Sequence, residues 1–176
     1  MTLNYKFLCL LVMSLFTLAL KNSTGGDYPI LNEILLETKS IDTRDWLREN
    51  YNGSSWFSAL EKVSIGDKEG LLIINHFAGD LDAGIAHDVV IAFSKGLMLN
   101  PENLFRYTVP TFNVGVICRG PNVDAVGSYE EAMKEFKKTV DAISKINSPE
   151  LLKIKKECLN ELNKAPFELR GYYGID

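Results

Sequence analysis

The sequence is poor in the residues from which catalytic and metal centres are most often built. It contains only three cysteines and two histidines. No histidine lies close in sequence to Cys118 or Cys158, so the ligand spacings of zinc sites are missing. The HExxH, paired HxH and EF-hand patterns are absent, and so is the GxSxG elbow of a nucleophilic serine. The sequence therefore indicates no particular enzymatic reaction, and we expect neither a metal nor a cofactor.

Long runs of one charge are also missing. The 19 basic and 23 acidic residues are interspersed and give a formal net charge of −4. Because nucleic acids and anionic membranes select basic patches, we expect neither as a partner. At 176 residues with 46% hydrophobic content, the chain has enough apolar material for one domain with its own core.

The longest apolar run lies at the N-terminus. Lys6 precedes the run from Phe7 to Leu20, and Lys21 and a polar stretch follow it. This order is typical of a secretory signal peptide, which we place at residues 1–24. A retained membrane anchor is the alternative, although a spanning helix needs about 20 apolar residues. We expect an exported protein, periplasmic or extracellular, without membrane contact after signal cleavage.

Signal cleavage would leave two cysteines, Cys118 and Cys158. In an oxidising compartment an even pair is most simply a disulfide, with two buried thiols as the alternative. Closing this loop would stabilise the fold by roughly 3–4 kcal/mol in the chain-entropy model.

Residues 27–164 are dominated by the period of three and four residues that marks one face of a helix. Ile85, Val89 and Phe93 are examples from residues 66–107, the stretch with the most helix-start signals. We predict one all-α domain, a compact multi-helix bundle of short helical hairpins in which solenoid-like stacking is one possible arrangement. Residues 109–118 form an extended or short helical connector. Residues 165–176 are expected to be a loosely ordered C-terminal tail.

Short acceptor side chains mark the expected helix starts, because they can cap free backbone N–H groups. The predicted structural caps are Asp67, Asp80, Asn100, Ser128 and Ser148. Asp82 is a second candidate beside Asp80. Proline follows both Asn100 and Ser148, at a helix position where no N–H donor is needed.

Three short stretches combine a tryptophan helix, two aspartate-led helix starts and an Asn-Pro break. They are Trp56-Phe57-x-Ala59-Leu60-x-x-Val63-x-x-Gly66-Asp67, Gly79-Asp80-x-Asp82-Ala83 and Asn100-Pro101-Glu102-Asn103-Leu104. Together with Cys118 and Cys158 they resemble a group of small exported proteins of Gram-negative bacteria. The resemblance covers residues 56–162. It implies an all-α exported fold and brings no activity or catalytic residue, because no activity is known for the group.

The best candidate for reactive chemistry is the set His76, Asp80 and His87, with Asp82 and Asp88 nearby. Two histidines and three carboxylates so close in sequence could bind a divalent metal or form an acid–base pair. However, residues 79–82 look like a turn between helices, which places the two histidines on different helices and uses the aspartates as caps. We therefore predict no catalytic residue, and keep a hydrolase or metal enzyme using His76, Asp80 and His87 as the alternative.

The favoured interpretation is a non-enzymatic module that binds a protein or peptide. An inhibitor or immunity-type protein is one concrete form, since a small acidic helical fold suits electrostatic capture of a basic enzyme. A third interpretation is a scaffold with a groove between stacked helical hairpins, which an exposed apolar patch near Trp46 or Trp56 would favour.

Overall fold

The computed structural model describes residues 28–121 and 126–175, and the predicted signal peptide at residues 1–24 lies outside these ranges. Within them all regular structure is helical, so the all-α prediction is confirmed. The helices are α2 (Pro29–Glu37), α3 (Thr43–Asn50), α4 (Ser54–Ser64), α5 (Lys68–Phe77), α6 (Ala83–Leu99), α7 (Pro101–Thr108), α8 (Val114–Ile117), α9 (Tyr129–Ser144), η2 (Pro149–Leu151), α10 (Leu152–Leu162) and α11 (Ala165–Tyr173). None of the helices in the described ranges has the length and apolar character needed to cross a bilayer.

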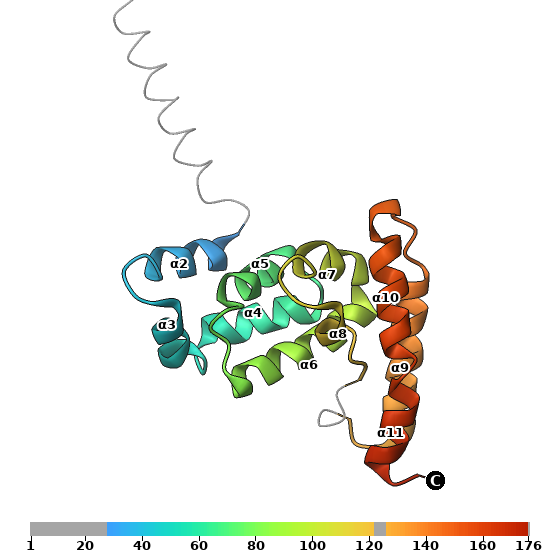
Figure 1. Ribbon diagram of the computed structural model, residues 1–176. Helices are drawn as coiled ribbons and strands as arrows, with labels where there is room; N and C mark the ends of the chain where they lie inside the picture. The colour runs from blue at the N-terminus through green and yellow to red at the C-terminus, as the bar shows by residue number, and fades with distance from the viewer. Residues whose placement is uncertain (1–27, 122–125, 176) are drawn as a thin grey trace, which may run out of the picture.

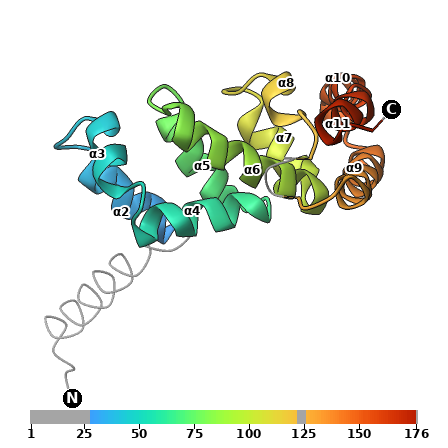
Figure 2. The ribbon, with the colours of Figure 1, turned by 90° about the horizontal axis from the view of Figure 1, so that it is seen from below.

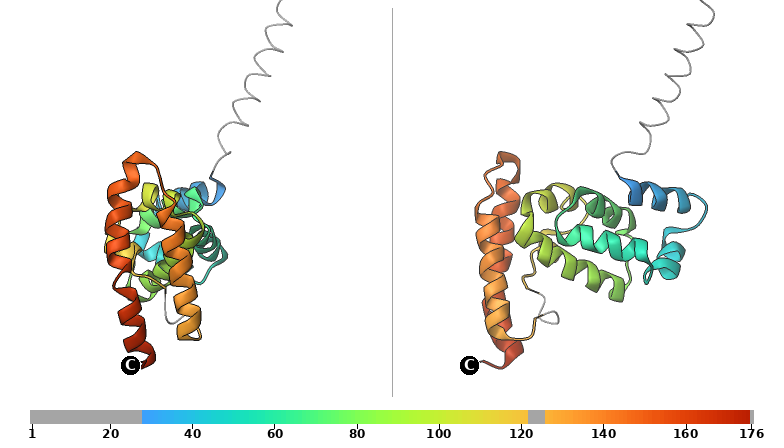
Figure 3. Two further views of the ribbon diagram at one scale, coloured as in Figure 1. Left: turned by 90° about the vertical axis from the view of Figure 1, so that its right-hand side faces the viewer. Right: turned by 180° about the vertical axis from the view of Figure 1, so that it is seen from behind.

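The helices are arranged in three parts along the molecule (Figures 1 and 2). Helices α2 and α3 lie at one end and α4 to α8 form the centre. At the other end, α9, α10 and α11 form a layer that crosses the central helices, with α9 and α10 side by side (Figure 3). Helix α6 joins the parts, because it packs on α4 in the centre and on α9 in the layer.

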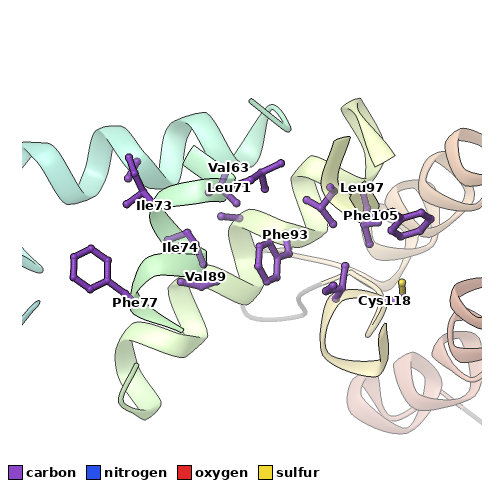
Figure 4. Packing of buried hydrophobic residues seen from close by; sticks show 14 of the residues in the cluster. Val63, Leu71, Ile73, Ile74, Phe77, Val89, Phe93, Leu97, Phe105 and Cys118 are labelled. Atoms are coloured by element: carbon purple, nitrogen blue, oxygen red, sulfur yellow. The ribbon is translucent and has the colours of Figure 1, made fainter. Parts of the chain in front are cut away.

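The core runs continuously through the central helices towards the α9–α11 layer (Figure 4). Near α3, Phe77 stacks on Trp46 with ring centroids 5.1 Å apart and meets Trp56 edge-on at 6.0 Å. Both tryptophans are buried, with 1% and 0% of their surface exposed. An exposed apolar patch near these residues, which would favour the scaffold interpretation, is therefore not formed by the tryptophan rings themselves.

Two glycines allow α4 to pack closely against α5 and α6. A Cβ atom on Gly70 of α5 would lie 2.7 Å from the backbone nitrogen of Val63 and 2.8 Å from the carbonyl oxygen of Ala59. A Cβ atom on Gly96 of α6 would lie 2.7 Å from the carbonyl oxygen of Val63. Since backbone atoms cannot rotate away as side chains do, any side chain here must push the helices apart.

A buried carboxylate attaches α2 to the centre. The Glu69 side chain accepts hydrogen bonds from the backbone nitrogens of Ile30, at 2.6 Å, and Leu31, at 3.0 Å. It therefore satisfies the first turn of α2, whose own N-cap residue makes no side-chain cap bond. Lys62 pairs with the same carboxylate at 3.1 Å. Chiefly through this hydrogen bond to Glu69, the pKa of Lys62 is raised, which favours its charged form.

Three of the predicted caps are observed as such. The side chains of Asp67, Asn100 and Ser128 accept backbone hydrogen bonds at the starts of α5, α7 and α9. The prediction for Asp80 is wrong, because α6 begins later and is capped by Asp82, which accepts from the Ile85 nitrogen at 3.0 Å. Ser148 precedes the first residue of η2 without capping it. Its hydroxyl donates instead to Glu102 at 2.9 Å.

The C-terminal segment differs from the loosely ordered tail that we expected. Residues 165–173 form α11, which packs on α9. Ala165 and Leu169, one helical turn apart, are each only 3% exposed, and the Tyr173 hydroxyl donates to the Val126 carbonyl at 3.0 Å. Gly174, in the left-handed region at φ 62°, ends the helix. The short apolar face of this segment is sufficient to keep it helical, because the neighbouring helix α9 covers that face.

Candidate functional site

The three residues proposed for catalysis lie in three different surroundings. His76 of α5 is half-buried, and its Nε2 lies 3.1 Å from the Thr38 hydroxyl at the end of α2. Asp80 accepts a hydrogen bond from the Thr43 hydroxyl and pairs with Arg44 at 3.4 Å. His87 lies on the exposed side of α6 and lines a different hollow. The structure therefore does not bring His76, Asp80 and His87 together as one reactive site.

Metal-ligating side chains are also dispersed over the part of the chain that the structure describes. Within residues 28–121 and 126–175, no three His, Cys, Asp or Glu side chains gather in a way that could hold a metal ion. Asp80 and Asp82 share a small hollow of about 270 Å³. Asp80 is already bonded to Thr43 and Arg44 there, and Asp82 is engaged as the cap of α6. Both carboxylates have structural partners.

A larger hollow lies between α6 and α11, with a cavity volume of about 560 Å³. We call it the α6–α11 hollow. Its lining residues are Ala83, Ala86, His87 and Val90 on α6, Val116, Arg119, Gly120 and Pro121 on and after α8, and Ala165, Glu168, Leu169 and Tyr172 on α11. On both long walls these residues recur at steps of three and four, so each wall is one face of a helix.

A disulfide holds the third wall of the hollow. Cys118, directly after α8, is bonded to Cys158 of α10, as predicted, and both residues are fully buried. Gly120 follows at φ 99°, in the region that favours glycine, and a Cβ atom there would lie 3.0 Å from the Ala165 side chain. The backbone of this wall thus lies directly against α11. The covalent link and this close approach together fix the hollow's shape.

Comparison of the chain with models of known protein families, with characterised proteins and with solved structures gives no match. Its function is therefore inferred from the geometry of its own residues.

The α6–α11 hollow combines an apolar lining with a polar rim. Small and branched apolar side chains such as Ala86, Val90 and Leu169 line it. His87, Arg119 and Glu168 also line it and are exposed to solvent, so one acid, one base and one imidazole lie at its edge. Such a rim can bond both to donors and to acceptors. This arrangement is typical of sites that bind a ligand mainly by apolar contact and orient it with a few polar groups.

Of these rim residues, only His87 was predicted from the sequence. It was grouped with its neighbours in sequence rather than with the residues that share its hollow. Arg119 lies in a loop and Glu168 in the segment that was expected to be a tail. The available signal was the helical period of Ala165, Leu169 and Tyr172, which predicts a partner face for α6 once residues 165–173 are accepted as a helix.

Proposed function

We propose that this chain is a non-enzymatic binding module that captures a peptide segment of another protein in the α6–α11 hollow. The observation that carries the proposal is an open apolar hollow of about 560 Å³ that the side chains of residues 28–121 and 126–175 leave unfilled. Ligand sites typically measure about 300–1,000 Å³ and have mostly apolar linings, as this hollow has. Apolar side chains of the peptide would enter between α6 and α11. Its backbone N–H and C=O groups would bond to Glu168 and Arg119 at the rim.

The separation of His76, Asp80 and His87 supports a binding role over the hydrolase alternative. An acid–base pair has to reach the same substrate atoms within hydrogen-bond distance. His76 and Asp80 each contact the α2–α3 region, whereas His87 lines the hollow next to α11. No second function is therefore proposed.

Filling the hollow should abolish peptide binding. Ala86 is half-buried and lines the hollow, so Ala86→Phe would place a ring where the peptide side chain enters. Random peptides of about 12 residues, which reach roughly 40 Å in extended form, would be displayed on phage and selected on the purified protein. We expect selected peptides to share large apolar side chains. Ala86→Phe should weaken their binding by about tenfold or more, as loss of a buried anchor does.

Ala142→Phe is the matched control. Ala142 is also a half-buried helical alanine, but it lies on α9 and lines a different hollow. Both changes have the same small cost in helix propensity, about 0.5 kcal/mol. Equal binding by the wild-type protein and Ala86→Phe would contradict the proposal, as would selection that enriches no apolar residues.

Export from the cytoplasm is part of the same proposal. It is supported by the basic start and apolar run of residues 6–20 and by the disulfide, which is typical of oxidising compartments. Cleavage near residue 24 is expected to leave a chain that begins shortly before the start of α2. Mass spectrometry of the protein recovered from its host tests this expectation. A chain that still begins at Met1 would contradict it.

A further inference from the structure

A second exposed apolar area lies where the C-terminal ends of α4 and α6 meet α9. Ile65, directly after α4, is 57% exposed, and Leu99 at the end of α6 is 65% exposed. With Met98 and Ala142 they line a hollow of about 440 Å³. Large aliphatic side chains that are exposed together, rather than singly, are typical of interaction sites.

The same area concentrates positive charge on an acidic protein. Lys95, Lys138 and Lys145 line this hollow, and Lys134, Lys137 and Lys138 line the adjoining one along α9. We call these five lysines, together with Ile65 and Leu99, the α9 lysine surface. The acids that line the two hollows are Glu130 and Asp141. The chain as a whole has a net charge of −4, so this excess of bases is local.

Among the residues that the structure describes, one of these five lysines forms an ion pair. Lys145 pairs with Asp141 at 3.1 Å. Lys95, Lys134, Lys137 and Lys138 form no ion pair with any residue in the described ranges. By contrast, Lys155 of α10 donates to the carbonyls of Ser144 and Ile146 and so caps the end of α9. Neighbouring lysines that form no ion pair repel one another, and an acidic ligand would reduce that repulsion.

We propose that the α9 lysine surface docks an acidic amphipathic helix of a partner protein. Apolar residues on one face of that helix would cover Ile65 and Leu99, and acidic residues on its flanks would face the lysines. The two hollows share Lys138 and together follow α9 from Tyr129 to Lys145, a length of roughly 24 Å at 1.5 Å per residue. A partner helix of similar length fits this surface in the helix-in-groove manner. This surface is separate from the α6–α11 hollow and goes beyond the function proposed above.

A protein helix suits the surface better than an anionic membrane does. A membrane is flat, whereas the exposed apolar residues border a hollow. Membrane attraction also depends on the charge of the whole face within a Debye length, about 8 Å at physiological salt, and Glu130 and Asp141 line the same two hollows as the lysines.

The probe is a synthetic peptide of about 18 residues, close to the length of α9, with leucine at helical spacing and glutamate elsewhere. A matched peptide carries lysine in place of every glutamate. Fluorescence anisotropy with the full protein should show that the glutamate peptide binds about tenfold or more tightly than the lysine peptide. Raising ionic strength from about 0.01 M to about 0.15 M shortens the Debye length from about 30 Å to about 8 Å and should weaken that binding.

Paired variants separate this surface from the rest of the protein. Lys95→Glu/Lys138→Glu is expected to reduce binding of the glutamate peptide by about tenfold or more. The control Lys153→Glu/Lys156→Glu makes the same charge change at exposed positions of α10 and should have little effect. Ala142→Phe, which fills the hollow, should also weaken binding, whereas Ala86→Phe should not. The two proposed sites can therefore fail independently.

Three results would overturn the proposal. One is equal binding of the glutamate and lysine peptides. Another is equal loss of binding in the α9 and α10 lysine variants. The third is binding to phosphatidylglycerol vesicles, but not to the glutamate peptide, that disappears in Lys95→Glu/Lys138→Glu, because that result would assign the surface to a membrane.

Discussion

Replacing Gly70 with alanine is expected to destabilise the protein by about 1–3 kcal/mol, the usual cost of overpacking. In an exposed helix the same change stabilises by up to about 1 kcal/mol, because alanine is the better helix former. At Gly70 the effect of alanine on stability changes from stabilising to destabilising. The reason is that the new methyl group would lie 2.7 Å from the Val63 nitrogen and 2.8 Å from the Ala59 carbonyl oxygen. Relief requires movement of α5 away from α4, and that movement would disturb the packing of both helices.

Gly171→Ala is the control for this prediction. Gly171 also lies in a helix, α11, but a Cβ atom there would meet nothing within 4 Å. We expect a gain of up to about 1 kcal/mol at this position. Urea unfolding followed by circular dichroism measures both variants on one scale. If Gly70→Ala is as stable as the wild-type protein, or more stable, the close contact between α4 and α5 is contradicted.

Helix starts were predictable from the sequence where the capping side chain and the backbone nitrogen that donates to it lie within one turn. Asp67, Asn100 and Ser128 each accept a bond from a nitrogen two or three residues later, so the signal is local. Asp80 and Asp82 present the same local signal. The choice between them is made by distant residues, because Thr43 and Arg44 bind Asp80 and leave Asp82 to cap α6.

Features that depend on residues far apart in the chain could not be predicted. Glu69 looks like an ordinary acid in the first turn of α5, yet it caps α2 across 39 and 38 residues. The candidate site also depends on residues that are far apart in the chain. Its rim joins His87, Arg119 and Glu168 from three separate segments, and nothing in the spacing of those residues shows that α11 lies opposite α6. The helical period indicates which face of a segment is apolar, but not which other face covers it.

Removing the disulfide is expected to have the largest effect on stability. Cys118 and Cys158 close a loop of 40 residues, and in the chain-entropy model such a link stabilises a fold by about 4 kcal/mol. Cys118→Ala/Cys158→Ala should therefore unfold at a lower urea concentration than the wild-type protein. Dithiothreitol should lower the wild-type midpoint and leave that of the double variant unchanged. Equal midpoints for the oxidised protein and the double variant would contradict a stabilising role.

The same change should affect the candidate site before the protein unfolds. The wall formed by Val116, Arg119 and Pro121 is cross-linked to α10 by the disulfide between Cys118 and Cys158. Without that bond, hydrogen exchange at residues 116–120 should become faster in the folded state, since the backbone hydrogen bonds of Val116, Ile117 and Cys118 all belong to one short turn that can open locally. Peptide affinity should then fall even where circular dichroism still reports folded protein, because a mobile wall must be ordered again on binding. Unchanged affinity in the folded double variant would show that the hollow keeps its shape without the disulfide, and that packing of Gly120 against α11 is sufficient to hold it.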